Sequence, residues 1–153
     1  MKTIEMEIAL AYYFGYRRNL IVPNVWWGMG FNHELDLLVL TPAGYGYEVE
    51  IKINKYDLIK DKEKLHCHKS HKIKHLYFAI TEKLEPYIDH IPKHAGIIII
   101  KNEFKVWQQS KKKLLRKPEK TSDYKFTETE RVELYRLMAL RIWGLKEKLS
   151  NQL

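Results

Sequence analysis

Residues 45–53, with the sequence YGYEVEIKI, decide the fold class of this 153-residue chain. Apolar and polar side chains alternate along them with a period of two residues, which is typical of a β-strand. One face of the expected strand is apolar, and the other carries Glu48, Glu50 and Lys52 in a row. The apolar face predicts contact with a hydrophobic core, whereas the charged row needs partners or water.

A second strand comes directly before this one, at residues 34–40 (ELDLLVL). Residues 41–44, Thr-Pro-Ala-Gly, are typical of a turn between two antiparallel neighbours. Asp36 on the first strand is therefore expected close to the charged row on the second.

Helices and further strands alternate on both sides of this hairpin. The expected elements are a helix over residues 3–14 that ends at Gly15, a strand over 18–22 that Pro23 stops, a helix from Asn54 to about Leu65, a strand over 76–80, a short helix or turn over 81–91, and a strand over 95–100. This order predicts an α/β fold with an αβββαβ core, in which helices flank a mixed central sheet.

The C-terminal third is expected to hold one more edge strand at residues 104–107 and then a lysine-rich linker. Thr127 and Glu130 match the capping-box pattern, which predicts the start of a final helix. Its expected apolar stripe is Val132, Tyr135, Met138 and Ile142. We therefore divide the chain into a core over residues 1–109, a basic linker over 110–126 and a C-terminal amphipathic helix over 127–153. That helix can pack on the core or mediate formation of a homodimer.

The charge balance favours a polyanionic partner. The chain has 27 Lys and Arg against 19 Asp and Glu, a net charge of +8, and cationic proteins release condensed counterions when they bind nucleic acid. Cys67 is the single cysteine, which excludes an internal disulfide framework. No signal peptide is evident, and the most apolar run, residues 95–100, is too short to span a bilayer. The protein is expected to be cytoplasmic.

The charged row and Asp36 together are suited to a metal site. Mg²⁺ or Mn²⁺ prefers hard oxygen ligands, and the carboxylates of Asp36 and Glu50 with the carbonyl of Ile51 supply three of them. The Lys52 ammonium is then placed to orient a water or to stabilise negative charge on phosphate. These roles predict metal-assisted hydrolysis of a phosphodiester. The alternative is an ordinary exposed sheet face with cross-strand ion pairs.

Asp36, followed fourteen residues later by Glu50-Ile51-Lys52 within this order of elements, resembles the PD-(D/E)XK nuclease superfamily. YEVEIKINKYDLIKDKEK followed by KHLYFAI is similar to the MmcB-like DNA-repair branch and its phage-encoded relatives. The resemblance covers about residues 1–100, and Leu35 stands where the motif has proline. It implies a restriction-endonuclease-like fold, Asp36 and Glu50 as metal ligands, and Lys52 as the catalytic lysine.

Members of that superfamily often add a glutamate from the first helix, and this chain offers Glu5 and Glu7. Glu7 lies near the edge of the apolar stripe formed by Ile4 and Ala11, so we prefer it as a site residue. Both glutamates are also compatible with solvated helix charges.

Three further groups have two interpretations each. Asp57 and Asp61 are expected to support their own helix, through its N-terminus and through pairing with Lys60 or Lys64, rather than to line the site. His33 could approach the site from the entrance of its strand. The His- and Lys-rich passage 66–75, with Cys67, favours phosphate contact over structural zinc, because paired ligand spacing is missing.

Trp26, Trp27 and Phe31 form a stacking platform for bases or cap the core. The lysines at 111–113, with Arg116, Lys117 and Lys120, are expected to be a basic arm that adds affinity for DNA.

These observations predict a DNA nuclease, acting endo- or exonucleolytically, that depends on Mg²⁺ or Mn²⁺ and serves repair, recombination or phage DNA processing. The alternatives are a non-catalytic DNA-binding module on the same fold and a subunit that binds a partner through its last helix.

Overall fold

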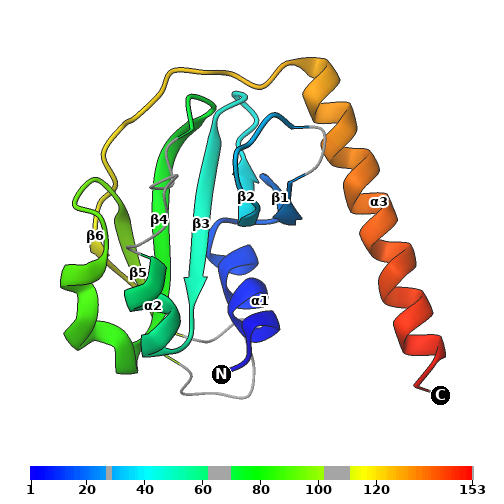
Figure 1. Ribbon diagram of the computed structural model, residues 1–153. Coiled ribbons are helices and arrows are strands. Elements are labelled where there is room, and N and C mark those ends of the chain that lie inside the picture. Colours follow the sequence, from blue (N-terminus) through cyan, green and yellow to red (C-terminus); the bar gives the residue numbers. More distant parts are fainter. Residues whose placement is uncertain (27–28, 62–69, 102–110, 153) are drawn as a thin grey trace.

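The computed structural model describes residues 1–26, 29–61, 70–101 and 111–152. A single sheet of six strands runs through the molecule, and helices lie on both of its faces (Figure 1). The elements in chain order are α1 Thr3–Tyr13, β1 Leu20–Val25, β2 Leu35–Leu40, β3 Gly46–Lys52, α2 Lys55–Asp61, β4 Ile73–Thr81, the 3₁₀ helix η1 Glu82–His90, β5 Gly96–Lys101, β6 Lys111–Arg116 and α3 Glu128–Ser150. Within these ranges no helix is long and apolar enough to cross a membrane.

The sheet is mixed, and its strands follow chain order from β1 to β6. β1, β2 and β3 form an antiparallel meander, β3, β4 and β5 are parallel, and β6 returns antiparallel to β5. A short turn suffices for the first hairpin, whereas the parallel pairs need the crossovers that α2 and η1 provide. The predicted αβββαβ order and the mixed sheet flanked by helices are confirmed.

One face of the sheet packs against α1. Met6, Ala9 and Leu10 of this helix are fully buried. They join the inward side chains of five strands in one apolar cluster: Ile21, Leu37, Val39, Val49, Ile51, Ala79, Ile98 and Ile100. The apolar side of the 45–53 strand therefore has the role predicted for it.

The opposite face carries two separate apolar clusters. Leu38, Phe126 and Leu134 belong to the one over β1 and β2, and Leu58 and Phe78 to the one over β4 and β5. The charged row of β3 lies between them, because Glu48 is paired with Leu38 on one side and with Leu76 on the other. Charged groups thus occupy the seam between two hydrophobic cores.

The strand expected over residues 18–22 instead runs over Leu20–Val25, so Pro23 does not stop it. β1 is an edge strand, and an edge tolerates proline because the missing N–H can face away from the ladder. Asn24 has φ of 51°, and β1 ends one residue later, at Val25.

Part of the basic linker predicted over residues 110–126 is a strand. Lys111–Arg116 form β6, and lysine on an edge strand is a common defence against unwanted strand pairing. Residues 117–126 then run across the ends of the sheet strands, in yellow and orange in Figure 1. Backbone N–H groups of Glu119, Thr121 and Phe126 donate to the carbonyl oxygens of His94, Lys74 and Gly44, at 2.8, 2.9 and 2.9 Å. We call residues 117–126 the strap. The edge strand predicted at 104–107 and the end of α2 lie outside the described residues.

The capping box predicted for the last helix is confirmed, but its predicted apolar stripe is not the face that packs. Thr127 Oγ1 accepts from the N–H of Glu130, and the Glu130 carboxylate accepts from the N–H of Thr127. Leu134 is buried, with Leu137 and Met138 packed beside it. The other three residues of the expected stripe, Val132, Tyr135 and Ile142, are exposed.

Glu130 also links α3 to the rest of the protein through hydrogen bonds. Its carboxylate accepts from Lys72 Nζ at 2.6 Å and from the Tyr124 hydroxyl. Burial alone would raise the pKa of Glu130, but the hydrogen bonds from Lys72, Thr127 and Tyr124 outweigh it and lower the pKa to about 2. The carboxylate therefore stabilises the folded state only while it is ionised.

Replacing Glu130 by Gln should lower the free energy of unfolding at pH 7 by about 1–3 kcal/mol, because charge-assisted hydrogen bonds are lost. The folded pKa is depressed, so the contribution is present above the ordinary pKa of 4.5 and disappears as the pH falls toward 2. Urea denaturation of both proteins across that range measures the difference. Glu128→Gln, an exposed carboxylate in the same turn, is the control and should change stability by less than about 0.5 kcal/mol. A difference that did not vary with pH would contradict the assignment.

Candidate active site

The charged row of β3 is buried. Glu48, Glu50 and Lys52 expose 0%, 2% and 6% of their surface, so each must have a polar partner to remain charged. Register with β2 and β4 fixes their common direction, away from α1. This burial is more than an ordinary exposed sheet face would show, and it distinguishes the row from the alternative of surface ion pairs.

Lys52 lies between two carboxylates. Its Nζ donates to Glu50 Oε2 at 2.8 Å and forms an ion pair with Asp61 Oδ1, also at 2.8 Å. The Phe78 ring centroid lies 5.9 Å from the same nitrogen. Burial alone would lower the pKa of Lys52, but Glu50 and Asp61 outweigh it and hold the pKa above the ordinary 10.5. Lys52 is thus a permanent cation near neutral pH, suited to stabilise negative charge and not to accept a proton.

Asp61 has a tertiary partner that was not predicted. It is buried in α2, and its Oδ1 lies 2.8 Å from Lys52 Nζ, whereas the predicted partner Lys64 lies outside the described residues. Asp57 does support its helix, because its carboxylate accepts from Asn54 Nδ2 at 2.5 Å while its backbone N–H donates to Asn54 Oδ1 at 2.9 Å. The two aspartates, one turn apart, thus have unlike surroundings.

Asp36 contacts β3 through its side chain. The regular pairing of β2 with β3 runs to Leu37 opposite Val49, and one residue farther Asp36 Oδ2 accepts from the N–H of Ile51 at 2.8 Å. This hydrogen bond puts the carboxylate beside the backbone between Glu50 and Lys52. The predicted proximity of Asp36 to the charged row is confirmed.

Glu7, on α1, is close enough to Asp36 for the two carboxylates to interact. Burial and then the negative charge of Asp36 raise the pKa of Glu7, and Arg141 partly offsets them. Glu5 instead accepts from the N–H of Lys2 at 2.6 Å, at the start of its own helix. Of the two helical glutamates, Glu7 is the one beside Asp36.

His33 and Glu48 extend the site on the β2 side. His33 is buried in the loop before β2, and its Nε2 lies 2.6 Å from Glu48 Oε1. Its Nδ1 lies 2.7 Å from Asn32 Oδ1, which holds the ring as second partners hold metal-binding histidines. The prediction that His33 approaches the site is confirmed. Glu48 was not predicted as a site residue. Its position two residues before Glu50, on the same charged face of the strand, was the sequence feature that could have identified it.

A metal ion could be held here by a mixed set of donors. One ligand atom each from His33, Glu48 and Glu50 lie within 4.8 Å of one another. Octahedral ligands at about 2.1 Å from a cation are up to about 4.2 Å apart, so a small contraction would bring all three into contact with one ion. Asp36 is outside this group. The nitrogen donor suits transition metals such as Zn²⁺ and Fe²⁺, and the carboxylates suit Mg²⁺ and Mn²⁺.

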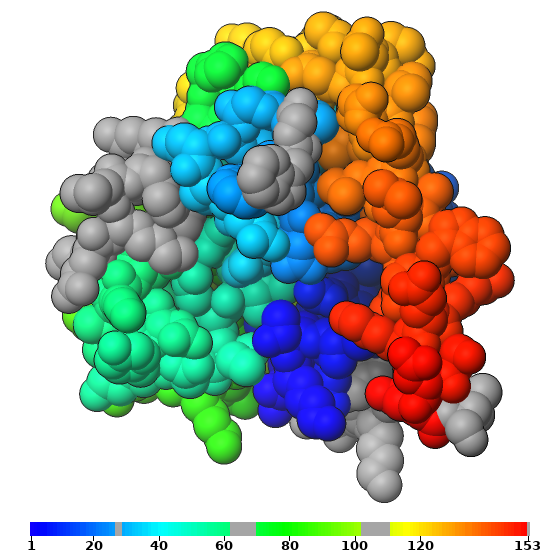
Figure 2. Space-filling view, turned by 45° about the vertical axis from the view of Figure 1, so that its right-hand side comes forward, coloured from blue at the N-terminus to red at the C-terminus, as the bar shows by residue number. Residues whose placement is uncertain are grey.

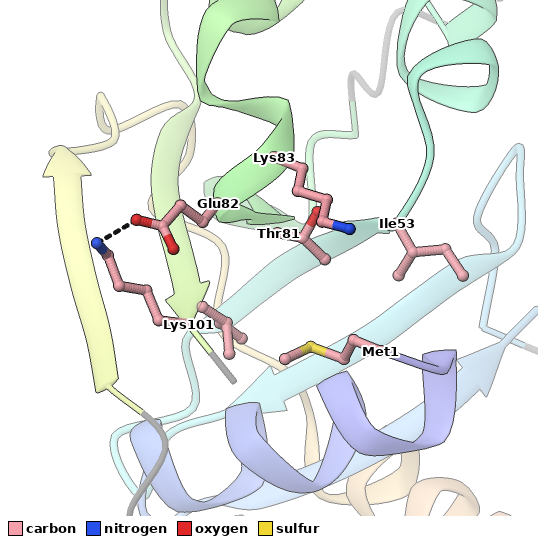
Figure 3. A pocket seen from close by; sticks show the side chains of 7 residues that line it. Met1, Ile53, Thr81, Glu82, Lys83 and Lys101 are labelled. Atoms are coloured by element: carbon pink, nitrogen blue, oxygen red, sulfur yellow. Dashed lines mark hydrogen bonds and ion pairs between the residues drawn. The ribbon is translucent and has the colours of Figure 1, made fainter. Parts of the chain in front are cut away.

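A surface hollow of about 290 Å³ lies elsewhere, where β4 and β5 end (Figure 3). Met1, Ile53, Thr81 and the Glu82–Lys101 ion pair are part of its lining. None of the charged row contributes to this hollow, since Ile53 follows Lys52 and points to the other side of the strand. The hollow is therefore separate from the candidate site.

The remaining predicted groups lie partly outside the described residues. The described residues do not include Trp27, His66, Cys67 or His68. The zinc alternative therefore stays a prediction. His75 Nδ1 lies 3.0 Å from the carbonyl oxygen of Glu119 in the strap. Trp26 is 42% exposed, whereas Phe31 packs beside Phe126.

Comparisons with known proteins bear on the fold alone. No family model matches the chain, and no curated protein matches it. A solved structure, the SPO1766 protein of unknown function from Silicibacter pomeroyi, superimposes with a TM-score of 0.59 over 96% of this chain and 90% of its own. At 14% identity this likeness supports the mixed α/β fold of nearly the whole chain and nothing finer.

Replacing Asp61 by Asn should destabilise the protein by about 1.5–3 kcal/mol, because a charged acceptor of the buried Lys52 is lost while Glu50 remains. Asp57→Asn, in the first turn of the same helix but exposed, should cost less than about 1 kcal/mol. Chemical denaturation at neutral pH without added metal measures both. Equal losses for the two variants would show that Lys52 does not depend on Asp61.

Proposed function

We propose that the protein is a divalent-metal-dependent nuclease that hydrolyses phosphodiester bonds in DNA. The observation that carries this proposal is the buried ammonium group of Lys52, which contacts Glu50 on its own strand and Asp61 on α2. Asp36 contacts the same strand through the N–H of Ile51. A buried cation costs several kcal/mol to desolvate, and its charge acts most strongly on a substrate that excludes water.

Each residue has a role in this proposal. His33, Glu48 and Glu50 would supply the ligands of a cation that polarises the phosphate and acidifies a water, and Asp36 lies close by on β2. Lys52 stabilises the negative charge that develops on the phosphate. Glu7 lies beside Asp36 and its pKa is raised, so it is suited to share a proton with the Asp36 carboxylate.

The charge distribution supports a nucleic acid as the substrate. The net charge is +8, and exposed lysines gather on β6 and the strap, among them Lys111, Lys113, Lys117, Lys120 and Lys125. Cationic side chains of this kind bind phosphates without reading sequence. A role in repair, recombination or phage DNA processing is compatible with such binding.

Purified protein should cut DNA in the presence of Mg²⁺ or Mn²⁺ and not with chelator. Lys52→Met should lower the rate at least about 100-fold, as loss of a group that stabilises transition-state charge does. Lys55→Met, which removes an exposed lysine three residues away that stacks on Tyr87, should leave the rate within about twofold. The assay is a cleavage panel with duplex, single-stranded and branched DNA, with circular dichroism as the test of folding.

A panel in which no DNA form is cut with either metal would overturn the nuclease proposal. The exposed lysines of β6 and the strap would then favour a second function, a non-catalytic DNA-binding module on this fold. Such a module should bind DNA in a salt-dependent manner, and its affinity should survive Asp36→Ala and Lys52→Ala.

Metal binding can be tested apart from activity. Mn²⁺ should raise the melting temperature of the wild-type protein, since a ligand that binds only the folded state stabilises it. His33→Ala should weaken this effect by about 10-fold or more in apparent affinity. His94→Ala, which removes a histidine outside the site, should retain it. Equal responses of the three proteins would exclude His33 from the metal site, whatever the outcome of the cleavage panel.

A further inference from the structure

An unusual concentration of exposed apolar side chains lies on α3. The described residues include twelve exposed large hydrophobic side chains, and seven of them are on this helix: Val132, Tyr135, Leu140, Ile142, Trp143, Leu145 and Leu149. In Figure 2 the helix is a continuous ridge on the surface, in orange to red. Exposed apolar side chains in this number on one element are typical of a binding site.

The body of the protein covers only a small part of the helix. Leu134, Leu137 and Met138 pack on the cluster over β1 and β2, and Arg141 donates to the carbonyl oxygen of Asn24 at 2.6 Å. Residues 142–150 follow with every side chain exposed. A free helical segment of this length is marginal in water, and it gains stability when its apolar side chains are covered.

The exposed side chains include a regular seam. Six of them follow one another at intervals of three and four residues: Val132, Tyr135, Ala139, Ile142, Lys146 and Leu149. This is the heptad spacing of a coiled coil. At 100° per residue the seam lies about 120° around the helix from the face that packs on the body. Docking on the seam therefore leaves the contacts of Leu134 and Met138 in place.

The seam is complementary to a second copy of itself in the antiparallel direction. An axis between residues 140 and 141 pairs Val132 with Leu149 and Ala139 with Ile142, and Tyr135 then lies against the stem of Lys146. Arg136 of one copy comes close to the exposed Trp143 of the other, a favourable cation–π pair. Each contact occurs twice, as a two-fold interface requires.

Charge favours the same direction. In the N-terminal half of α3 the acidic Glu128, Glu130 and Glu133 outnumber Arg131 and Arg136, whereas in the C-terminal half Arg141, Lys146 and Lys148 outnumber Glu147. In an antiparallel pair Glu133 faces Lys148, and the two helix dipoles oppose each other favourably. A parallel pair would instead bring together ends of the same net charge.

We propose that two copies of this chain associate through α3, as an antiparallel helix pair along the seam from Val132 to Leu149. This interface is independent of the proposed nuclease activity. It gives the C-terminal half of α3 the partner that the body of the protein does not supply.

Sedimentation velocity of the full chain over a concentration series should show a dimer. Ile142→Glu, in the seam, should convert it to monomer, because two carboxylates would be buried near the axis. Leu140→Glu is the matched control: it is exposed to a similar extent, 57% against 52%, but lies off the seam and should leave the dimer intact. The far-UV circular dichroism of both variants verifies that they fold.

Cross-linking tests the direction. In a Cys67→Ser background, Val132→Cys and Leu149→Cys proteins should form a disulfide dimer when mixed and none when oxidised separately. A wild-type chain that stays monomeric up to about 100 µM would overturn the proposal. Equal disruption by the Leu140 variant, or cross-linking of either cysteine protein with itself, would also overturn it.

Discussion

The structure depends on one buried cation. Lys52 lies at the end of β3, in contact with Glu50 on its own strand and Asp61 on the next helix. All three are almost fully buried. Loss of Lys52 would leave two buried carboxylates without this cation, and loss of either carboxylate would leave Lys52 with a single charged partner, so both changes are more costly than the loss of a surface ion pair. This requirement fixes the position of α2 on the sheet. It also explains why two apolar clusters form on this face instead of one, since the charged row separates them.

The same constraint connects packing to chemistry. Asp36 reaches the backbone of β3 from one side, and α1 brings Glu7 near Asp36 from the other face. His33 completes a set of nitrogen and oxygen donors with Glu48 and Glu50. The residues come from a helix, a loop and two strands, and the strand register brings them together. A one-residue slip of β3 would turn the whole row to the α1 face and dismantle the site.

Period-two alternation was sufficient to predict the charged row and its direction, because burial of one strand face leaves few alternatives. The capping box at Thr127 was equally readable, since it depends on residues three apart. Asp61 could not be assigned, because i to i+3 and i+4 pairing within a helix accounts for it as well as a tertiary contact does. His33 could be linked to the site but not to Glu48, since a loop carries no period. β6 was missed because a lysine-rich sequence has little apolar patterning, and its strand forms only when β5 offers a free edge.

Because of the strap, part of the sheet is covered by residues that come much later in the sequence. Gly46 is the first residue of β3, and a Cβ atom there would come within 2.6 Å of the Phe126 ring. The first half of the sheet is therefore covered by a residue that follows eighty positions later in the sequence. Thr121 is likewise bonded to Lys74 in β4, and Glu119 to His94 just before β5, residues that precede them by more than twenty positions. Contacts of such long sequence separation incur their loop-closure entropy before they give any stabilisation. A nascent chain could therefore have the hairpin of β2 and β3 already synthesised and still leave one apolar cluster uncovered until the strap emerges.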